Sequence, residues 1–358
     1  MMEITASAPG KQVLLGDYAV LEGAPALVLA VNRRAEARIV SRDDGVCDVY
    51  APDLDVSAAR MTVDGDGAWQ WQCDGATAAK LTLVEHVWNG LRSEGLAPRS
   101  RAGFSIHLDT SGFFYGDGAS RMKLGLGSSA ALTVALASAL ATHAGHGDAM
   151  ADPAQWIRRL FHMHGGWQSG RGSGVDVAAG VAGGLISYQL VGHDHVPSFT
   201  HETWPMPGVH WLFVWSGQAV STSNSLRHLS QWRTANETKY AFHMKQLGAI
   251  SAAAVDALRT KKAQSFIGLT NDYAVALRNF GDACGLDIYS PAQKSLAEMA
   301  VRANVSFKPC GAGGDFGVVF ADDPERLATF ERAIVAAGMQ VIPLPLELRG
   351  VSCHMRQT

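Results

Sequence analysis

The chain has 358 residues, a length that predicts about two domains. Its composition is 47% hydrophobic and 18% charged, with 38 glycines, which is typical of a soluble globular protein with a large core and many tight turns. The formal net charge of −3 gives no general attraction to nucleic acid or to an anionic membrane, and we expect neither as a partner. An anionic substrate would therefore need a local cluster of positive charge.

The five cysteines are scattered and form no Cys-x-x-Cys pair, so the sequence predicts neither a disulfide framework nor a zinc site. Reduced thiols are typical of a cytoplasmic protein, which is the location that we expect. The N-terminal segment lacks a basic region followed by an apolar core, so no signal peptide is expected. The longest apolar run, residues 130–141, is too short to span a bilayer and predicts a buried helix.

The thirteen histidines follow no metal-ligand pattern. His162 and His164 are two residues apart, which places them on different sides of a helix, and no His-Glu-x-x-His motif occurs. We therefore expect these histidines to lie in the core or at the surface rather than to bind a metal.

Strands and helices alternate in the first half of the chain. Strands are predicted at residues 13–15, 26–31, 37–40 and 104–108. Residues 79–94 predict a helix, because their apolar positions recur with a period close to 3.6 residues. Further helices are predicted from residue 129, at 153–164 behind Pro153 and, after a glycine-rich connector at 165–174, at 175–181, followed by a strand at 185–190.

A change of composition at residues 193–207, which are rich in His, Pro and Thr, predicts a domain boundary. We place the N-terminal domain at residues 1–195 and the C-terminal domain at residues 196–358. The second half is more helical, with predicted helices at 224–258, 262–280, 291–303 and 324–337. Strands are predicted at 305–308, 317–320 and 340–348.

The most informative segment is Lys123-Leu-Gly-Leu-Gly-Ser-Ser-Ala-Ala, in which a glycine loop leads into a helix. Gly125 and Gly127 let the backbone approach a ligand closely, and Ser128 or Ser129 can cap the helix. The free N–H groups and the dipole of such a helix end favour polyphosphate. The alternative is a purely structural cap, and the segment is not a Walker-type P-loop because no lysine follows Gly127.

Three other segments carry candidate chemistry. In Ala-Pro-Gly-Lys11, the lysine is either an ordinary strand-end charge or a fixed positive charge that faces a transferred phosphate. In Gly-Ser173-Gly-Val-Asp176, the aspartate is either a helix N-cap or a carboxylate aimed at a substrate hydroxyl as general base. The third segment, residues 308–317, has three glycines within residues 311–314, which favours close backbone approach to a ligand.

Together and in this order, the four segments resemble the superfamily of galactokinase, homoserine kinase, mevalonate kinase and phosphomevalonate kinase, known as GHMP kinases. The resemblance runs from about Ala8 to Gly317. It implies an α+β fold of two domains, the first like ribosomal protein S5 domain 2 and the second ferredoxin-like, with the substrates in the cleft between them.

Within the superfamily the chain looks most like the phosphomevalonate kinase family. Tyr18 stands where mevalonate kinases usually have histidine, and Tyr115 and Gln168 fit the phosphomevalonate kinase pattern. The chain departs from that pattern at Gln218, where those enzymes often have lysine, and at the loop 311–314, which is one glycine short. Position 165 is glycine, where mevalonate kinases usually carry a magnesium-binding glutamate.

The resemblance implies roles for individual residues. Lys11 and Asp176 would be catalytic, and Ser129 would bind Mg²⁺. The ATP phosphates would lie on Gly125, Leu126, Gly127, Ser128, Ser129 and Ala130. The acceptor would contact residues drawn from Tyr18, Lys123, Gln168, Arg171, Ser173, Ser221, Thr222, Arg227, Gly311, Ala312, Gly313 and Gly314, of which Lys123, Arg171 and Arg227 are candidates for its phosphate.

The implied activity is transfer of the γ-phosphoryl group of ATP to 5-phosphomevalonate, a step of isoprenoid precursor synthesis in the mevalonate pathway. The alternatives are another GHMP kinase, such as a mevalonate kinase or a sugar kinase, and a catalytically silent homologue that only binds ligand. A decarboxylase relative is disfavoured because Gly311-Ala-Gly replaces the Asp-Ala-Gly turn expected there. The partner would be a small phosphorylated hydroxy acid, and the resemblance allows a homodimer.

Overall fold

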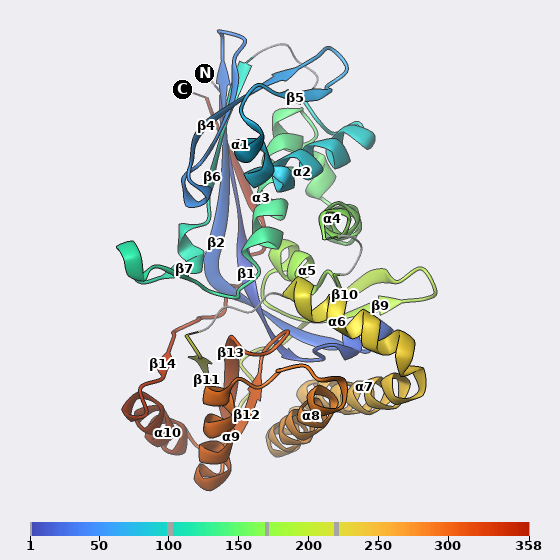
Figure 1. Ribbon diagram of the computed structural model, residues 1–358, viewed down its shortest axis with the longest axis vertical. Helices are drawn as coiled ribbons and strands as arrows, with labels where there is room; N and C mark the ends of the chain where they lie inside the picture. Colours follow the sequence, from blue (N-terminus) through green and yellow to red (C-terminus); the bar gives the residue numbers. More distant parts are fainter. Residues whose placement is uncertain (1, 99–102, 169–171, 218–221, 358) are drawn as a thin grey trace.

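A large and mostly antiparallel sheet forms the upper part of the molecule in Figure 1. The structure, a computed structural model, describes residues 2–98, 103–168, 172–217 and 222–357. In these ranges the sheet comprises β1 (Met2–Leu15), β2 (Ala26–Arg42), β3 (Cys47–Ala51), β4 (Val56–Val63), β5 (Trp69–Trp71), β6 (Gly103–Asp109), β9 (Leu185–Val191), β10 (Val196–Glu202) and β15 (Ser352–Gln357). The strand order is β10-β9-β2-β6-β3-β4-β5, and β1 lies between β2 and β15.

Helices cover one face of this sheet (Figure 1). They are α1 (Gly75–Lys80), α2 (Thr82–Ser93), α3 (Ser128–His143), α4 (Pro153–Trp167) and α5 (Val175–Ala182). The central helix α3 packs on β1 and β2 and is also contacted by α2, α4 and α5. Residues 130–141 are buried on every side, which explains why this run is apolar all round and confirms the predicted buried helix.

The lower part of the molecule is a smaller antiparallel sheet with its own helices (Figure 1). Its strands, in the order β12-β13-β11-β14, are Ser306–Pro309, Phe316–Ala321, His210–Trp215 and Gln340–Val341. The helices are α6 (Thr222–Ala235), α7 (Glu237–Arg259), α8 (Ala263–Cys284), α9 (Pro291–Ala303) and α10 (Pro324–Ala336). Within the described ranges, no helix has the length and apolar character needed to cross a membrane.

Some predicted elements differ from the structure. The helix expected over 224–258 is two helices, because Asn236 has φ −140° and ψ 45° and interrupts the helical backbone between α6 and α7. The strand expected over 340–348 is regular only at β14, and Leu346 forms a single bridge to Val31. The strands β3, β4, β5, β10, β11 and β15 were not predicted, nor were the short strands at Phe114–Tyr115 and Met122–Lys123.

The large sheet extends beyond residue 195. The composition change at 193–207 begins in the turn between β9 and β10, and these two strands pair along their whole length. Near the end of the chain, β15 returns to the same sheet and pairs with β1. The smaller sheet is therefore built from chain that lies between two strands of the larger one.

Candidate active site

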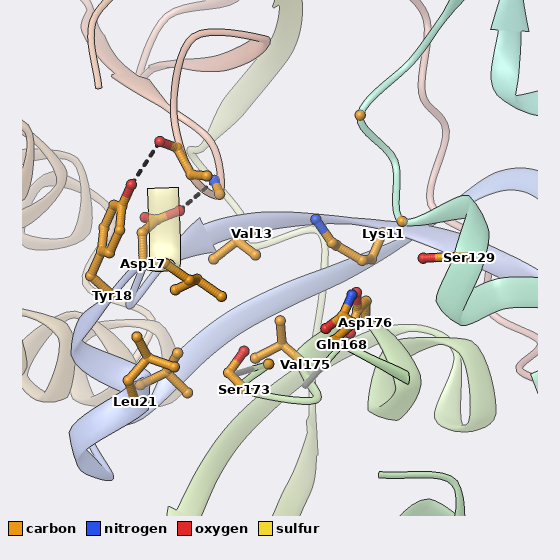
Figure 2. Close-up of a pocket in the computed structure, with 17 residues that line it drawn as sticks. Lys11, Val13, Asp17, Tyr18, Leu21, Ser129, Gln168, Ser173, Val175 and Asp176 are labelled. Atoms are coloured by element: carbon orange, nitrogen blue, oxygen red, sulfur yellow. Dashed lines mark hydrogen bonds between the residues drawn. The ribbon is translucent and has the colours of Figure 1, made fainter. Parts of the chain in front are cut away.

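A pocket of about 190 Å³ lies where the two sheets with their helices meet (Figure 2). Ten of the predicted site residues line it: Lys11, Tyr18, Gly125, Gly127, Ser129, Gln168, Ser173, Asp176, Gly311 and Ala312. They come from β1 and the turn after it, the glycine loop before α3, the C-terminal end of α4, the start of α5 and the loop between β12 and β13. The chain thus brings all four motif segments to one place.

Gly127 lies at the centre of the predicted phosphate-binding loop. It is the N-cap of α3 and has φ 76°, a left-handed backbone that favours glycine. A Cβ added there would lie 3.3 Å from Cβ of Asp176 and 3.4 Å from Cε of Lys11. The missing side chain therefore leaves room for both functional residues to lie against the start of α3.

The prediction that Ser128 or Ser129 caps α3 is wrong. Gly127 occupies the N-cap position, so the two serines are the first residues of the helix, and no side chain caps it. The first backbone N–H groups of α3 are consequently free of a side-chain acceptor, which is the arrangement that binds anions at helix N-termini. The backbone N–H of Lys11 donates to the carbonyl of Leu126 at 2.9 Å and fixes β1 against the loop.

Lys11 and Asp176 both face the pocket (Figure 2). Among the described residues, no carboxylate forms an ion pair with Lys11, so its charge is available to a ligand in the pocket. Asp176 is the second residue of α5 and Gly174 is the N-cap, which excludes the alternative that Asp176 caps the helix. Its Oδ1 accepts a hydrogen bond from the backbone N–H of Val177 at 3.1 Å.

The second glycine loop is held to the end of β1 by two side chains (Figure 2). Asp17 accepts a hydrogen bond from the backbone N–H of Gly311, and the hydroxyl of Tyr18 donates to the carbonyl of Ala312 at 2.8 Å. Asp17 also forms a fully buried ion pair with Lys308, at 2.7 Å. Burial raises the pKa of Asp17, while the charge of Lys308 opposes that rise.

Asp315, which follows the second glycine loop, packs against the first one. A Cβ added to Gly125 would overlap Oδ2 of Asp315, so glycine at this position is required by a neighbour rather than by a ligand. Burial raises the pKa of Asp315 to about 6, and the indole N–H of Trp215 and the backbone N–H of Gly125 partly oppose the rise.

Ser129 has a buried neighbour that sequence reasoning did not connect with the site. Nε2 of His164, on α4, lies 3.3 Å from Oγ of Ser129. Burial lowers the pKa of His164, and the carboxylate of Asp176 opposes that change. The imidazole is therefore neutral at neutral pH, and it contacts the hydroxyl that was predicted to bind Mg²⁺.

Several predicted residues do not line the pocket. Lys123 is exposed on β8 (Met122–Lys123), which pairs with β7 (Phe114–Tyr115), and Arg227 on α6 donates to Oδ1 of Asn224 at 3.0 Å. Leu126, Ser128, Ala130, Gly313 and Gly314 are buried or only partly exposed and support the two loops. Arg171, Gln218 and Ser221 lie outside the described residues, and only the backbone of Thr222 is described.

The pocket also has lining residues that were not predicted. They are Val13, Asp17, Val20, Leu21, Gly172, Val175 and Leu226. Asp17 had a usable signal, because it lies in the Gly-Asp-Tyr stretch directly before Tyr18. The apolar members carry no chemical signal in the sequence, and only the fold brings them to the site.

The oxygen atoms present are compatible with Mg²⁺. Ser129 contributes a hydroxyl and Asp176 a carboxylate to the same pocket, and Mg²⁺ binds oxygen ligands. In the described part of the chain, no three His, Cys, Asp or Glu residues form a dedicated metal site. Such a small set of donors fits an ion that is held mainly by nucleotide phosphates and water.

Comparison with known proteins shows which proteins share this fold. Residues 82–184 match the family model described as the GHMP kinases N-terminal domain. The chain has the two-domain α+β fold of the GHMP kinases, as the sequence motifs predicted.

The individual relatives point to the mevalonate kinases and phosphomevalonate kinases. A phosphomevalonate kinase of Streptomyces sp. is 27% identical over 97% of this chain and 98% of its own. A mevalonate kinase of Thermococcus onnurineus is 26% identical, with 94% of each chain covered. The structure of Streptococcus pneumoniae phosphomevalonate kinase in complex with phosphomevalonate and AMPPNP superimposes with a TM-score of 0.75 and 19% identity, covering 96% of this chain and 99% of that one.

Proposed function

We propose that this chain is an ATP-dependent small-molecule kinase whose acceptor is 5-phosphomevalonate. The observation that carries the kinase activity is the convergence of Lys11, Asp176 and the first turn of α3 around Gly127. A cation, a carboxylate and an anion-binding helix end then face one pocket. Phosphoryl transfer depends mainly on such positioning and charge stabilisation rather than on covalent catalysis by the protein.

In this proposal the ATP phosphates bind at residues 125–130, against the free N–H groups at the start of α3. A phosphate oxygen of the acceptor forms the new bond to the γ-phosphorus, the bond from that phosphorus to the bridging oxygen breaks, and ADP leaves. Lys11 neutralises charge that develops on the transferred group. The acceptor oxygen is largely ionised at neutral pH, so Asp176 positions the acceptor and needs little strength as a base.

Ser129 would hold Mg²⁺ through its hydroxyl, with Asp176 as the carboxylate in the same pocket. When it is bound, Mg²⁺ neutralises phosphate charge. Tyr18, Gln168, Ser173, Gly311 and Ala312 would surround the acceptor. We retain Lys123, Arg171 and Arg227 as proposals for the acceptor's own phosphate, to be tested by substitution.

Two observations support phosphomevalonate as the acceptor. The Streptomyces relative covers almost the whole chain, and Tyr18 lies in the pocket where its hydroxyl holds the second glycine loop. A specific observation favours a second candidate, mevalonate kinase. Lys11 is the one cationic side chain among the described lining residues, and a substrate without a phosphate needs fewer cations.

The test is ADP release by the purified protein with MgATP and one acceptor at a time: 5-phosphomevalonate, mevalonate, homoserine or galactose. Turnover with phosphomevalonate alone, lost in Asp176→Asn, is the expected result. Turnover with mevalonate alone would keep the kinase activity and replace the acceptor. Lack of turnover with every acceptor, although MgATP binds, would favour a homologue that only binds ligand.

A further inference from the structure

The hydroxyl of Ser129 has one described side-chain partner, the imidazole of His164. His164 is 3% exposed and lies on α4, a different helix from Ser129. Its other ring contact is with Trp167, one turn further along α4, at a centroid distance of 5.7 Å. The imidazole thus contacts Ser129 from a neighbouring helix and, unlike Ser129, is not among the residues that line the pocket.

A hydroxyl that binds a cation must turn a lone pair toward it and its proton elsewhere. Nε2 of a neutral imidazole accepts that proton when the ring hydrogen is on Nδ1. We propose that His164 is a positioning residue, which accepts the proton of the Ser129 hydroxyl and thereby directs the oxygen lone pairs of Ser129 into the nucleotide pocket. This inference rests on the proposed kinase function, because it concerns the Mg²⁺ that accompanies ATP.

The surrounding charges explain why this orientation matters. Of the two aspartates that line the pocket, Asp17 is already paired with Lys308, which leaves Asp176 as the carboxylate available there. Gly165, next to His164, provides no side chain, and a Cβ added there would have open space around it. The Ser129 oxygen therefore provides a large share of the protein's contribution to Mg²⁺ binding.

The chain offers a matched set of variants. Glutamine at position 164 keeps an amide group near the position of Nε2. Asparagine places its amide near the position of Nδ1, and its side chain is too short to reach Ser129. Leucine removes the hydrogen bond and keeps most of the bulk. His162 lies on the same helix but is exposed and makes no described contact with the site, so His162→Leu is the control.

The measurement is calorimetric binding of AMPPNP with and without Mg²⁺, together with thermal unfolding of each variant. For His164→Asn and His164→Leu we expect the gain in AMPPNP affinity on adding Mg²⁺ to fall about 10-fold, with the Mg²⁺-free affinity unchanged. His164→Gln should regain most of that gain, and His162→Leu should match the wild type.

An unchanged Mg²⁺ effect in His164→Asn, or an equal loss of affinity without Mg²⁺, would overturn the positioning role. If His164→Leu fails to fold, the comparison of His164→Asn with His164→Gln decides the question, because both replace the imidazole by an amide and only the glutamine amide can reach Ser129. Mg²⁺-dependent AMPPNP binding without turnover of any acceptor would refute the proposed kinase function alone. No Mg²⁺-dependent binding by the wild type would overturn both.

Discussion

Lys11 and Asp176 show what can be identified at the scale of single residues. Each has an ordinary structural explanation in its own segment, as a strand-end charge and as a helix cap. The structure removes the second explanation, because Gly174 is the cap of α5. Lys11 lines the pocket and has no paired carboxylate among the described residues, and it lies with Asp176 beside Gly127, which supports the roles proposed for both.

Replacing Lys11 by methionine should lower kcat by a factor on the order of 10² to 10³, because one preorganised charge that stabilises the transferred phosphoryl group is lost. Steady-state ADP release with the preferred acceptor measures this change. Lys239→Met, at an exposed position on α7, is the control and should retain wild-type activity. A loss below 5-fold in Lys11→Met would place this lysine outside the chemical step.

Asp315 predicts a pH dependence of stability. Its pKa is about 6 in the folded protein and 3.8 for the unperturbed group, so between these pH values the folded state binds the proton more tightly than the unfolded state. The free energy of unfolding therefore falls as pH rises through this window. Ionisation of Asp315 lowers it by at most about 3 kcal/mol, and this loss is complete above pH 6.

Asp315→Asn removes that charge. The variant should have a higher Tm than the wild type at pH 7.5, and the difference should shrink toward pH 4.5. Thermal unfolding at the two pH values measures it, with the exposed Asp43→Asn as control. A Tm difference that grows on acidification would contradict the assigned cause.

At the scale of elements, two glycine loops from different sheets lie in contact. Gly125 precedes α3, and Asp315 precedes β13, yet a Cβ on the former would overlap the carboxylate of the latter. The two loops therefore depend on each other's shape. Their sequences are 190 positions apart, and nothing in either segment alone indicates the contact.

Gly125→Ala should accordingly weaken AMPPNP binding at least 10-fold, because the new methyl group displaces the phosphate loop or Asp315. Gly125→Ala combined with Asp315→Ala should recover most of the affinity, since the carboxylate that obstructs the methyl group is gone. Calorimetry on the two single variants and the double variant measures this coupling. Simple additivity of the two losses would show that the loops act independently.

The success of prediction also differs among elements. The buried helix α3 and the four motif segments were predictable, because apolar runs, glycines and functional residues are local signals. The short strands β3 and β4 were missed because their pattern is weak without the neighbouring β6. The break at Asn236 was missed because residues on both sides of it favour helix. The contact of His164 with Ser129 depends on how α4 packs on α3, which no local pattern encodes.

At the scale of the whole molecule, a buried ion pair connects the two sheets. Asp17 follows β1 of the large sheet and Lys308 lies in β12 of the small one, and both side chains are fully buried. Asp17 also holds Gly311, so the same carboxylate fixes the relative position of the two sheets and the second glycine loop. The pocket between the sheets depends on this contact.

Lys308→Met should lower the free energy of unfolding by about 3–5 kcal/mol, because it leaves the Asp17 carboxylate buried without its partner. Asp17→Asn combined with Lys308→Met should recover part of that loss. Denaturant unfolding measures both, and Arg326→Met, which breaks a surface pair with Asp322, should cost less than about 1 kcal/mol. Equal destabilisation in the single and double variants would argue against the charge as the cause.

The pairing of β1 with β15 has a consequence for biosynthesis. Met2 lies opposite Gln357 in this ladder, so β1 is synthesised long before the strand that covers its outer edge. During translation that edge is an open row of backbone donors and acceptors, which other nascent chains can pair with. The large sheet is therefore completed only after β15 has been synthesised, and chaperone demand should persist until that moment.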